Sequence, residues 1–534
     1  MIPITKNVKA LSSKLLSFKK HKEHHSYNPA ADGDLVSFTP SSDLEELERY
    51  WIDEPYSFIS IVKTKQKEIE YNVIEPELDS FEILLIEEIH DVLKDVLTLE
   101  SVCDIDNINS IDKCKLLREK TEQVLSEYAE LEIKSFEKMF YYVRRDFIEF
   151  GKISAIMRDP NIEDIWCNGV NMHIHVFHIA YGSIPTNIVF NTSDELNSFV
   201  MRIAQQSGRH LSASTPILDT VMRDGSRINI TYGQEISPNG SSFSIRRLKK
   251  TPLTPLDLVA WHTFSSEMMA YFWFCVENHR NIIFCGSTAS GKTSSLNAIG
   301  MFIPPNKRIV SLEDTKEIQL PHDNWISTIT RDGISTDNIG KVDLDDLLRS
   351  SLRQRPEYLI VGEVRGKEAQ TLFQAMNAGH STCSTFHAGS ASEVINRFTN
   401  PPINIPEAMF SALDIICVQI NAYNLGVEKR RVAVVSEIVR VANTIETEDS
   451  FVWDQVTDSF ENKASHVLEK GSNVLEDIKR TRGWSNEDLR ADLNRRMLFL
   501  DSLIAKGIRD YESVAQWINL YYKDPEKVLS DLSS

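Results

Sequence analysis

A glycine-rich loop at residues 286–293 constrains the fold of this chain more than any other segment. Its sequence is GSTASGKT, and it follows the apolar run NIIFC at residues 281–285. Residues 294–299 then continue as a helix-forming stretch. A G-x-x-x-x-G-K-[ST] loop between a strand and a helix is a phosphate-binding P-loop. The pattern therefore predicts a parallel α/β domain, with strand–loop–helix alternation running to about residue 440.

Each residue type in this loop suits the phosphates of a nucleotide. Glycines let backbone N–H groups wrap around a phosphate, and the helix N-terminus adds positive potential. We expect Lys292 to reach the β- and γ-phosphates of ATP and the Thr293 hydroxyl to ligate Mg²⁺. The candidate nucleotide-binding residues are Gly286, Ser287, Thr288, Ala289, Ser290, Gly291, Lys292, Thr293 and Ser294.

Two later apolar runs end in acidic residues. The run YLIVGE at 358–363 ends in Glu363, and the run RIVSLED at 308–314 ends in Glu313 and Asp314. A carboxylate at the carboxyl end of a buried strand can hold Mg²⁺, so Glu363 is the first candidate metal ligand and Asp314 a second. One of the pair Glu313 and Asp314 could orient or deprotonate the attacking water. The alternative for this pair is a solvated strand end.

Histidines and arginines gather around the same segments. His380 and His387 flank the run 381–386 and could bond phosphate oxygens, although two histidines alone are weak evidence. Phosphoryl transfer needs cationic stabilisation, often by an arginine from a neighbouring subunit. Of eight candidates we expect two or three to be phosphate ligands and the rest to form surface ion pairs. They are Arg349, Arg353, Arg355, Arg365, Arg223, Arg227, Arg246 and Arg247.

Composition excludes several other classes of protein. The 534 residues predict three or four domains, and the net charge of −19 argues against a protein that coats nucleic acid. The seven cysteines form no C-x-x-C pair, so no zinc site is predicted. Since no apolar run approaches the roughly 20 residues of a membrane span, we expect a cytoplasmic protein.

The first 26 residues differ from the rest because they carry six lysines and one acid. Apolar residues at positions 4, 8, 11, 15 and 18 recur at helical spacing. Residues 4–22 could therefore bind an anionic membrane surface or a partner groove. The alternatives are a helix packed on its own protein and a loose tail.

Changes in composition and in hydrophobic periodicity along the chain suggest how it is divided into domains. We expect a basic tail (1–27), a helical or α+β subdomain (28–150), a second α/β domain (151–248), a linker (249–256), the P-loop motor (257–442) and a helical C-terminal subdomain (443–534). Within it, strands are expected at 173–178 and 227–232 and a helix at 193–206. The acidic stretch 444–459 is expected to be rich in loops, and Ser485 with Asp488 forms a capping box.

Four motifs in this order resemble the secretion ATPases that power type II secretion, type IV pili and the archaellum. GSTASGKT is similar to their Walker A box, LEDTKE to the aspartate box, LIVGEVRG to the Walker B box and AGHSTCSTFHA to the histidine box. The stretch IEDIWCNG…GSIPTNI and the tail after residue 484 resemble the archaeal branch. The resemblance covers residues 45–530.

The resemblance implies a fold and an assembly. The fold would be α/β, with an N-terminal α+β (PAS-like) domain, a RecA-like motor and helical additions at both ends. Family members form homohexamers that bind ATP between two lobes, with arginines such as Arg223, Arg227 and Arg246 acting across the subunit interface. They dock on a polytopic membrane platform protein at the inner face of the cell membrane and act indirectly on pilin-like subunits.

The resemblance also implies roles for single residues. Lys292 would neutralise the γ-phosphate, Glu313 would position water, Glu363 would support Mg²⁺ and His387 would sense the γ-phosphate. Thr315 stands where many members have proline, and the tetracysteine zinc module of bacterial relatives has no counterpart. An archaellum motor is the alternative within the family. A nucleic-acid translocase is the alternative outside it, and the acidic charge argues against that class.

Overall fold

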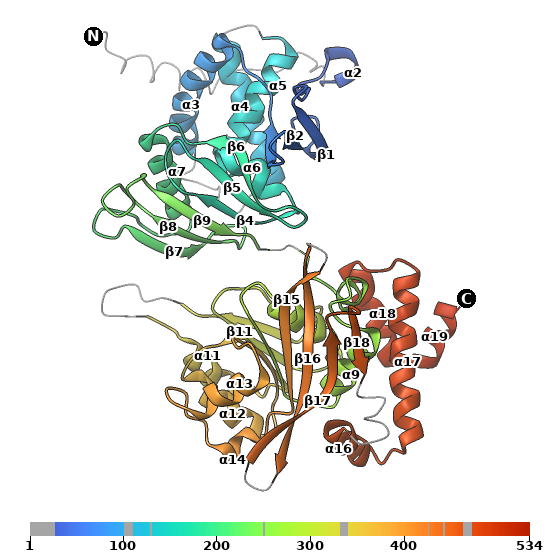
Figure 1. The fold of residues 1–534 in the computed structure, drawn as a ribbon. Helices are drawn as coiled ribbons and strands as arrows, with labels where there is room; N and C mark the ends of the chain where they lie inside the picture. Colours follow the sequence, from blue (N-terminus) through green and yellow to red (C-terminus); the bar gives the residue numbers. More distant parts are fainter. Residues whose placement is uncertain are drawn as a thin grey trace. The chain divides into compact units, whose positions relative to one another are not determined.

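The chain forms two compact units, Met1–Leu248 and Lys249–Ser534, drawn in blue to green and in green to red in Figure 1. The computed structural model describes residues 27–100, 110–128, 131–248, 251–331, 340–424, 427–441, 444–462 and 472–533. The predicted basic helix at 4–22 lies outside the described residues. Among the helices described, none is both long enough and apolar enough to span a bilayer.

A mixed sheet organises the N-terminal unit, in the order β1-β2-β3-β6-β5-β4-β9-β8-β7. Parallel pairing of Tyr71 with Thr186 joins the first three strands to the others. Side chains alternate along the strands, so that Ile174 and Val176 enter the core while their neighbours face outward. The strands are β1 (Leu44–Asp53), β2 (Ser57–Thr64), β3 (Ile69–Ile74), β4 (Ile162–Cys167), β5 (His173–His178), β6 (Gly182–Val189), β7 (Ile217–Val221), β8 (Arg227–Thr231) and β9 (Ser242–Arg246).

Helices of this unit form two groups. The helices α3 (Ser80–Glu100), α4 (Ser110–Tyr128) and α5 (Ile133–Phe147) share a hydrophobic cluster of their own, whereas α7 (Ser193–Gln206) packs on the sheet. The strand predicted at 173–178 and the helix predicted at 193–206 both form, the latter capped by Thr192. Shorter helices are α2 (Pro29–Asp32), η2 (Gly151–Ile153) and α6 (Ser154–Arg158).

The C-terminal unit contains the predicted parallel sheet, extended by antiparallel strands. The order is β12-β11-β13-β14-β10-β15-β16-β17-β18, and pairing is parallel from β12 to β15. The predicted α/β class is therefore confirmed. The strands are β10 (Ile282–Gly286), β11 (Ile309–Glu313), β12 (Trp325–Ile329), β13 (Tyr358–Val364), β14 (Ser381–Phe386), β15 (Ile415–Asn424), β16 (Val427–Val441), β17 (Thr444–Asp454) and β18 (Ser459–Asn462).

Helices cover both faces of this sheet. Successive residues of β10 point to opposite faces, with Phe284 in one hydrophobic cluster and Ile283 in the other. This double burial explains the continuous apolar run before the glycine-rich loop. The helices are α8 (Pro255–Ala260), α9 (Ser266–Glu277), α10 (Lys292–Gly300), α11 (Leu344–Ser351), η3 (Leu352–Gln354), α12 (Glu368–Asn377), α13 (Ala391–Thr399), α14 (Glu407–Phe410), α16 (Asn473–Arg482), α17 (Asn486–Ala505), α18 (Tyr511–Lys523) and α19 (Pro525–Ser533).

The stretch 444–459 corrects one prediction, because it is largely strand and not loop. Residues Thr444–Asp454 form β17, which pairs antiparallel with β16 and carries β18 on its other edge. Glu446 and Glu448 face solvent while Ile445 and Thr447 are half-buried. Glu446 and Glu448 thus occupy one face of a strand, and antiparallel pairing with the preceding strand β16 makes the extended conformation favourable.

The predicted linker 249–256 also ends differently. Thr254 caps α8 in a capping box, and Pro255 occupies the first helical turn. Leu256 is fully buried in the core of the C-terminal unit. The last two residues of the expected linker therefore belong to a packed helix.

Candidate functional site

The glycine-rich loop joins β10 to α10 at the carboxyl edge of the parallel sheet. The register pairs Cys285 with Phe386 and Val361 with Ser384, so β10, β13 and β14 end close together. β11 pairs with β13 alongside them. This topology brings the loop, Glu313, Glu363 and His387 to one edge, as the sequence predicts for a P-loop site.

Two glycines of the loop are required by its geometry. A Cβ at Gly286 would come within 2.2 Å of the carbonyl oxygen of Gln419 and 2.5 Å of the Ser290 Oγ. Gly291 is the residue before α10 and has φ of 94°, in the left-handed region that favours glycine. Residues 287–289 between them are exposed, so their backbone is accessible to a ligand.

Lys292 opens α10 with its side chain folded back over the loop. Its Nζ donates to the carbonyl oxygens of Gly286 at 3.0 Å and Ser287 at 2.7 Å. The same atom lies 3.4 Å from Nδ1 of His387. Burial lowers the pKa of the ammonium, and the charge of Glu363 acts in the opposite direction.

Glu363 is the centre of a charged cluster at the end of β13. Its Oε2 accepts a hydrogen bond from Arg365 at 2.5 Å, and its Oε1 lies 3.0 Å from His387 Nε2, close enough for an ion pair but without hydrogen-bond alignment. Arg365 also reaches Asp314 at 3.3 Å. Burial raises the pKa of Glu363, but Arg365, His387 and Lys292 together outweigh it and the net shift is downward. Glu363 is therefore a carboxylate near neutral pH.

Glu313 has a different environment, although it lies at the end of the neighbouring strand. It is only 2% exposed, and its Oε1 accepts the backbone N–H groups of Glu317 at 2.9 Å and Ile318 at 2.8 Å. Its Oε2 is buried with no hydrogen-bond partner among the described residues. Burial raises the pKa of this carboxyl to about 7 in spite of the two N–H donors. A carboxyl with an open lone pair that titrates near neutrality has the properties of a general base.

Of the other residues that the sequence predicts for the site, two lie at the start of α10 and one lies at the far end of a strand. Thr293 and Ser294 are half-buried in the first turn of α10. His380 lies at the opposite, amino end of β14, with Nδ1 3.2 Å from the carbonyl oxygen of Ala375. Only one of the two histidines therefore reaches the P-loop edge.

The predicted trans arginines belong to the N-terminal unit and have partners there. Arg227 on β8 pairs with Asp219 at 2.7 Å, and Arg246 on β9 pairs with Asp164 at 3.4 Å. Arg223 donates to the carbonyl oxygen of Ile148 at 3.3 Å. Arg247 is different because it bonds the carbonyl oxygens of Met157 and Ile162, a structural role.

Two residues beside the loop were missed by sequence reasoning. Gln419 on β15 is fully buried under the loop and donates from Nε2 to Ser295 Oγ at 2.7 Å. The Cδ of Arg430 on β16 would lie 3.5 Å from a Cβ placed at Gly291. The chain carries no local motif for either, because strand pairing alone brings β15 and β16 next to the loop.

The residues present fit a nucleotide with Mg²⁺. Residues 287–289 of the loop are exposed, and a lysine ammonium is already held over that loop by carbonyl oxygens. The Thr293 hydroxyl and the Glu363 carboxylate are hard oxygen donors, the type that Mg²⁺ prefers.

Comparison with known families gives three matches along the chain. The family described as Type II/IV secretion system protein matches residues 151–459. Families described as PilB3-like, N-terminal and PilB3-like, C-terminal match residues 7–77 and 461–533.

Individual relatives include one of similar length. An uncharacterized protein of Methanocaldococcus jannaschii is 35% identical over 510 residues, which is 90% of this chain and 91% of that protein. The type IV secretion system protein VirB11 of Bartonella henselae is 25% identical, covering 46% of this chain and 78% of the relative. Among solved structures, the ATPase DotB of Legionella pneumophila matches with a TM-score of 0.40 at 15% identity, covering 68% of this chain and 92% of that one.

Proposed function

Because the chain belongs to the family of type II/IV secretion system proteins, we propose that it is an ATP-hydrolysing motor that powers assembly of a type IV pilus-like filament or type II-like secretion. The observation that carries the proposal is the cluster of Lys292, His387, Glu363 and Arg365 at the glycine-rich loop. A buried glutamate that titrates near neutrality lies on the next strand.

Binding of ATP would use the loop and Lys292. Backbone N–H groups of residues 287–291 and the N-terminus of α10 provide positive potential for the phosphates. The Lys292 ammonium would exchange its two carbonyl partners for phosphate oxygens. Because both carbonyl groups belong to the loop itself, this exchange needs no large movement of the lysine side chain. Thr293 and Glu363, with Asp314 as a further candidate, would hold Mg²⁺, which supplies charge neutralisation at the transferring phosphoryl group.

Hydrolysis would use Glu313 and His387. Glu313 accepts a proton from, or orients, the attacking water through its open Oε2, while two backbone N–H groups fix Oε1. His387 contacts both Lys292 and Glu363, so its position responds to what those side chains bind. Arg365, and Arg430 beside Gly291, are cations of the same subunit that can stabilise charge developing on phosphate.

The motor would act as a homohexamer at the cytoplasmic face of a membrane. Arg223, Arg227 and Arg246 would contribute across the subunit interface, and a polytopic membrane platform protein would be the docking partner, with pilin-like subunits moved indirectly. These assignments come from the resemblance of the motifs to secretion ATPases. An archaellum motor uses the same motifs, and deletion of the gene scored for swimming against surface filaments would separate the two roles.

Replacement of Lys292 by alanine tests the proposal most directly. We expect kcat for ATP hydrolysis to fall by at least about a hundredfold, because a preorganised cation at the phosphates is lost. Phosphate release from purified protein is the measurement. Lys307→Ala is the matched control, since Lys307 pairs with Glu357 at the surface and contacts no residue of the loop. Retained turnover in Lys292→Ala, with an unchanged melting temperature, would exclude this site.

A further inference from the structure

The two strand-end carboxylates expected to hold Mg²⁺ share a cation of this chain. The Nη2 atom of Arg365 donates to Glu363 Oε2 at 2.5 Å, and its Nη1 atom donates to Asp314 Oδ2 at 3.3 Å. The hydrogen bond to Glu363 raises the pKa of the guanidinium, as expected when both groups are charged. One planar guanidinium therefore bridges the carboxyl ends of β13 and β11.

Both carboxylate oxygens of Glu363 face a side chain that can carry positive charge. Oε2 accepts from Arg365, and Oε1 lies 3.0 Å from Nε2 of His387. Mg²⁺ takes oxygen ligands at about 2.0–2.1 Å in near-octahedral geometry. A divalent ion at Oε2 would meet the guanidinium at short range, where like charges repel. Binding of the ion is therefore opposed for as long as Arg365 keeps this contact.

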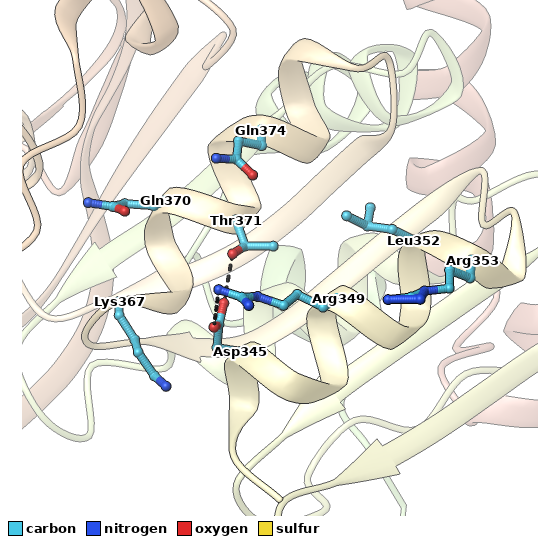
Figure 2. A pocket seen from close by; sticks show the side chains of 8 residues that line it. All are labelled: Asp345, Arg349, Leu352, Arg353, Lys367, Gln370, Thr371 and Gln374. Atoms are coloured by element: carbon cyan, nitrogen blue, oxygen red, sulfur yellow. Dashed lines mark hydrogen bonds and ion pairs between the residues drawn. The ribbon is translucent and has the colours of Figure 1, made fainter.

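The side chain of Arg365 can move while its backbone stays in place. The side chain is 58% exposed. The carboxylate of Glu368, a buried residue of α12, accepts the backbone N–H groups of Arg365 at 2.5 Å and Gly366 at 2.6 Å. α12 is in turn held to α11 by the hydrogen bond from Thr371 to Asp345 at 2.7 Å, drawn in Figure 2. These contacts fix the base of the arginine and leave its charged end open to solvent.

The other two cationic groups near Glu363 have different contacts. Lys292 donates to two carbonyl oxygens of the loop, and His387 reaches Glu363 but has no contact with Asp314 among the described residues. Within the described part of the chain, Arg365 is thus the cation that contacts both carboxylates. A change at Arg365 should therefore affect the pair as a whole.

We propose that Arg365 competes with the divalent metal for Glu363 and Asp314 and so sets how much metal the site requires. The inference rests on the proposed function, because that function assigns these carboxylates to Mg²⁺. Arg365 is a positioning residue here, since it acts through the two carboxylates and not by contact with the metal. Displacement would also release a guanidinium at the edge of the sheet where the glycine-rich loop lies, as a cation for phosphate.

Binding of Mn²⁺ to the full chain without nucleotide tests the proposal, with the free ion measured by electron paramagnetic resonance. We expect Arg365→Gln to bind Mn²⁺ about tenfold more tightly than the wild type, because one cation no longer repels the ion. The double variant Arg365→Gln with Glu363→Gln should lose this gain. Lys367→Gln is the matched control: Lys367, labelled in Figure 2, follows Arg365 by two residues but pairs with Asp343 at 2.9 Å, and its variant should bind Mn²⁺ as the wild type does.

Thermal unfolding gives a second readout on the same proteins. Because the side chain of Arg365 is largely exposed, Arg365→Gln should fold. Mn²⁺ should then raise the melting temperature of Arg365→Gln by more than that of the wild type or of Lys367→Gln, since an ion that binds the folded state more tightly stabilises it more. A merely structural ion pair would lower the melting temperature of the variant without this response to metal.

Four results would overturn the proposal. Equal Mn²⁺ affinity in the wild type and Arg365→Gln would mean that the arginine does not compete, and an equal gain in Lys367→Gln would mean a general effect of charge. A gain that persists in the double variant would place the ion elsewhere. No binding by any of the proteins would mean that Glu363 and Asp314 hold no divalent ion. Failure of the proposed function is separate, because the assay contains no nucleotide: that function fails if Lys292→Ala retains ATP turnover.

Discussion

Among single residues, Glu313 and Glu363 show how two glutamates at neighbouring strand ends acquire different chemistry. Arg365, His387 and Lys292 surround Glu363 and lower its pKa, whereas burial of Glu313 outweighs its two N–H donors and the charge of Lys316, and its pKa rises to about 7. Both residues follow apolar runs in the sequence, so both could be predicted as strand-end carboxylates. Their division of roles could not, because it depends on partners brought in by other strands.

The raised pKa of Glu313 predicts a pH effect on stability. Its ordinary pKa is about 4.5, so between about pH 4.5 and 7 the folded chain holds a proton that the unfolded chain has released. Stability of the wild type should therefore fall as the pH rises through this window. Glu313→Gln lacks this ionisation, and its melting temperature should exceed that of the wild type by more at pH 8 than at pH 5.

Activity of the same variant should change in a characteristic way. If Glu313 is the base, kcat of Glu313→Gln should fall by about a hundredfold or more, and the wild-type loss of rate below about pH 7 should disappear. Glu407→Gln, an exposed glutamate in the first turn of α14, is the control and should keep the wild-type profile. An acid limb that persists unchanged in Glu313→Gln would assign that limb to another group.

At the scale of helices and strands, a buried arginine connects two helices of the C-terminal unit. Arg496 on α17 is 3% exposed and reaches Glu277 of α9 and Asp492 of α17, each at 2.7 Å. Arg482 of α16 contacts Glu277 as well, at 2.6 Å. Glu277 thereby connects α9 with the consecutive helices α16 and α17, which lie far from α9 in the sequence.

Replacement of Arg496 by methionine should destabilise this unit. We expect a loss of about 3–5 kcal/mol in the free energy of unfolding, because the buried Asp492 loses its cation and the half-buried Glu277 keeps only Arg482. Urea denaturation is the measurement. Arg490→Met, on the exposed face of the same helix, should change stability by less than about 0.5 kcal/mol. A loss below about 1 kcal/mol for Arg496→Met would mean that solvent reaches Glu277.

Helices and loops whose conformation depends on residues close in the sequence were predicted correctly. A strand whose conformation depends on pairing with another strand was not. The glycine-rich loop, the helix at 193–206 and the capping box of Ser485 and Asp488 each depend on residues close in sequence, and each forms. β17 was expected to be loop because its acidic residues dominate its composition. The alternation of apolar or small residues with acidic ones at 445–448 was the available sign of a strand. Only when β17 pairs with β16 does one side of this strand face the protein, so that its side chains can be buried.

For the whole molecule, the proposed ring makes a prediction about mixed assemblies. Arg227→Ala subunits mixed with wild type should lower ATP turnover by more than their mole fraction, because each would also impair the site of a neighbour. Turnover against the fraction of variant is the measurement, with Arg490→Ala mixtures as the control. A strictly proportional loss would show that Arg227 acts within its own subunit or not at all.

The described hydrophobic clusters also divide at the boundary between the two units. Those of the N-terminal unit include residues no later than Ile245, and those of the C-terminal unit begin at Leu253. Since core substitutions couple only when they share neighbours, effects within one unit should add to those in the other. In evolutionary terms, a lineage can then repack the N-terminal unit to suit a new partner while selection keeps the nucleotide-binding core unchanged.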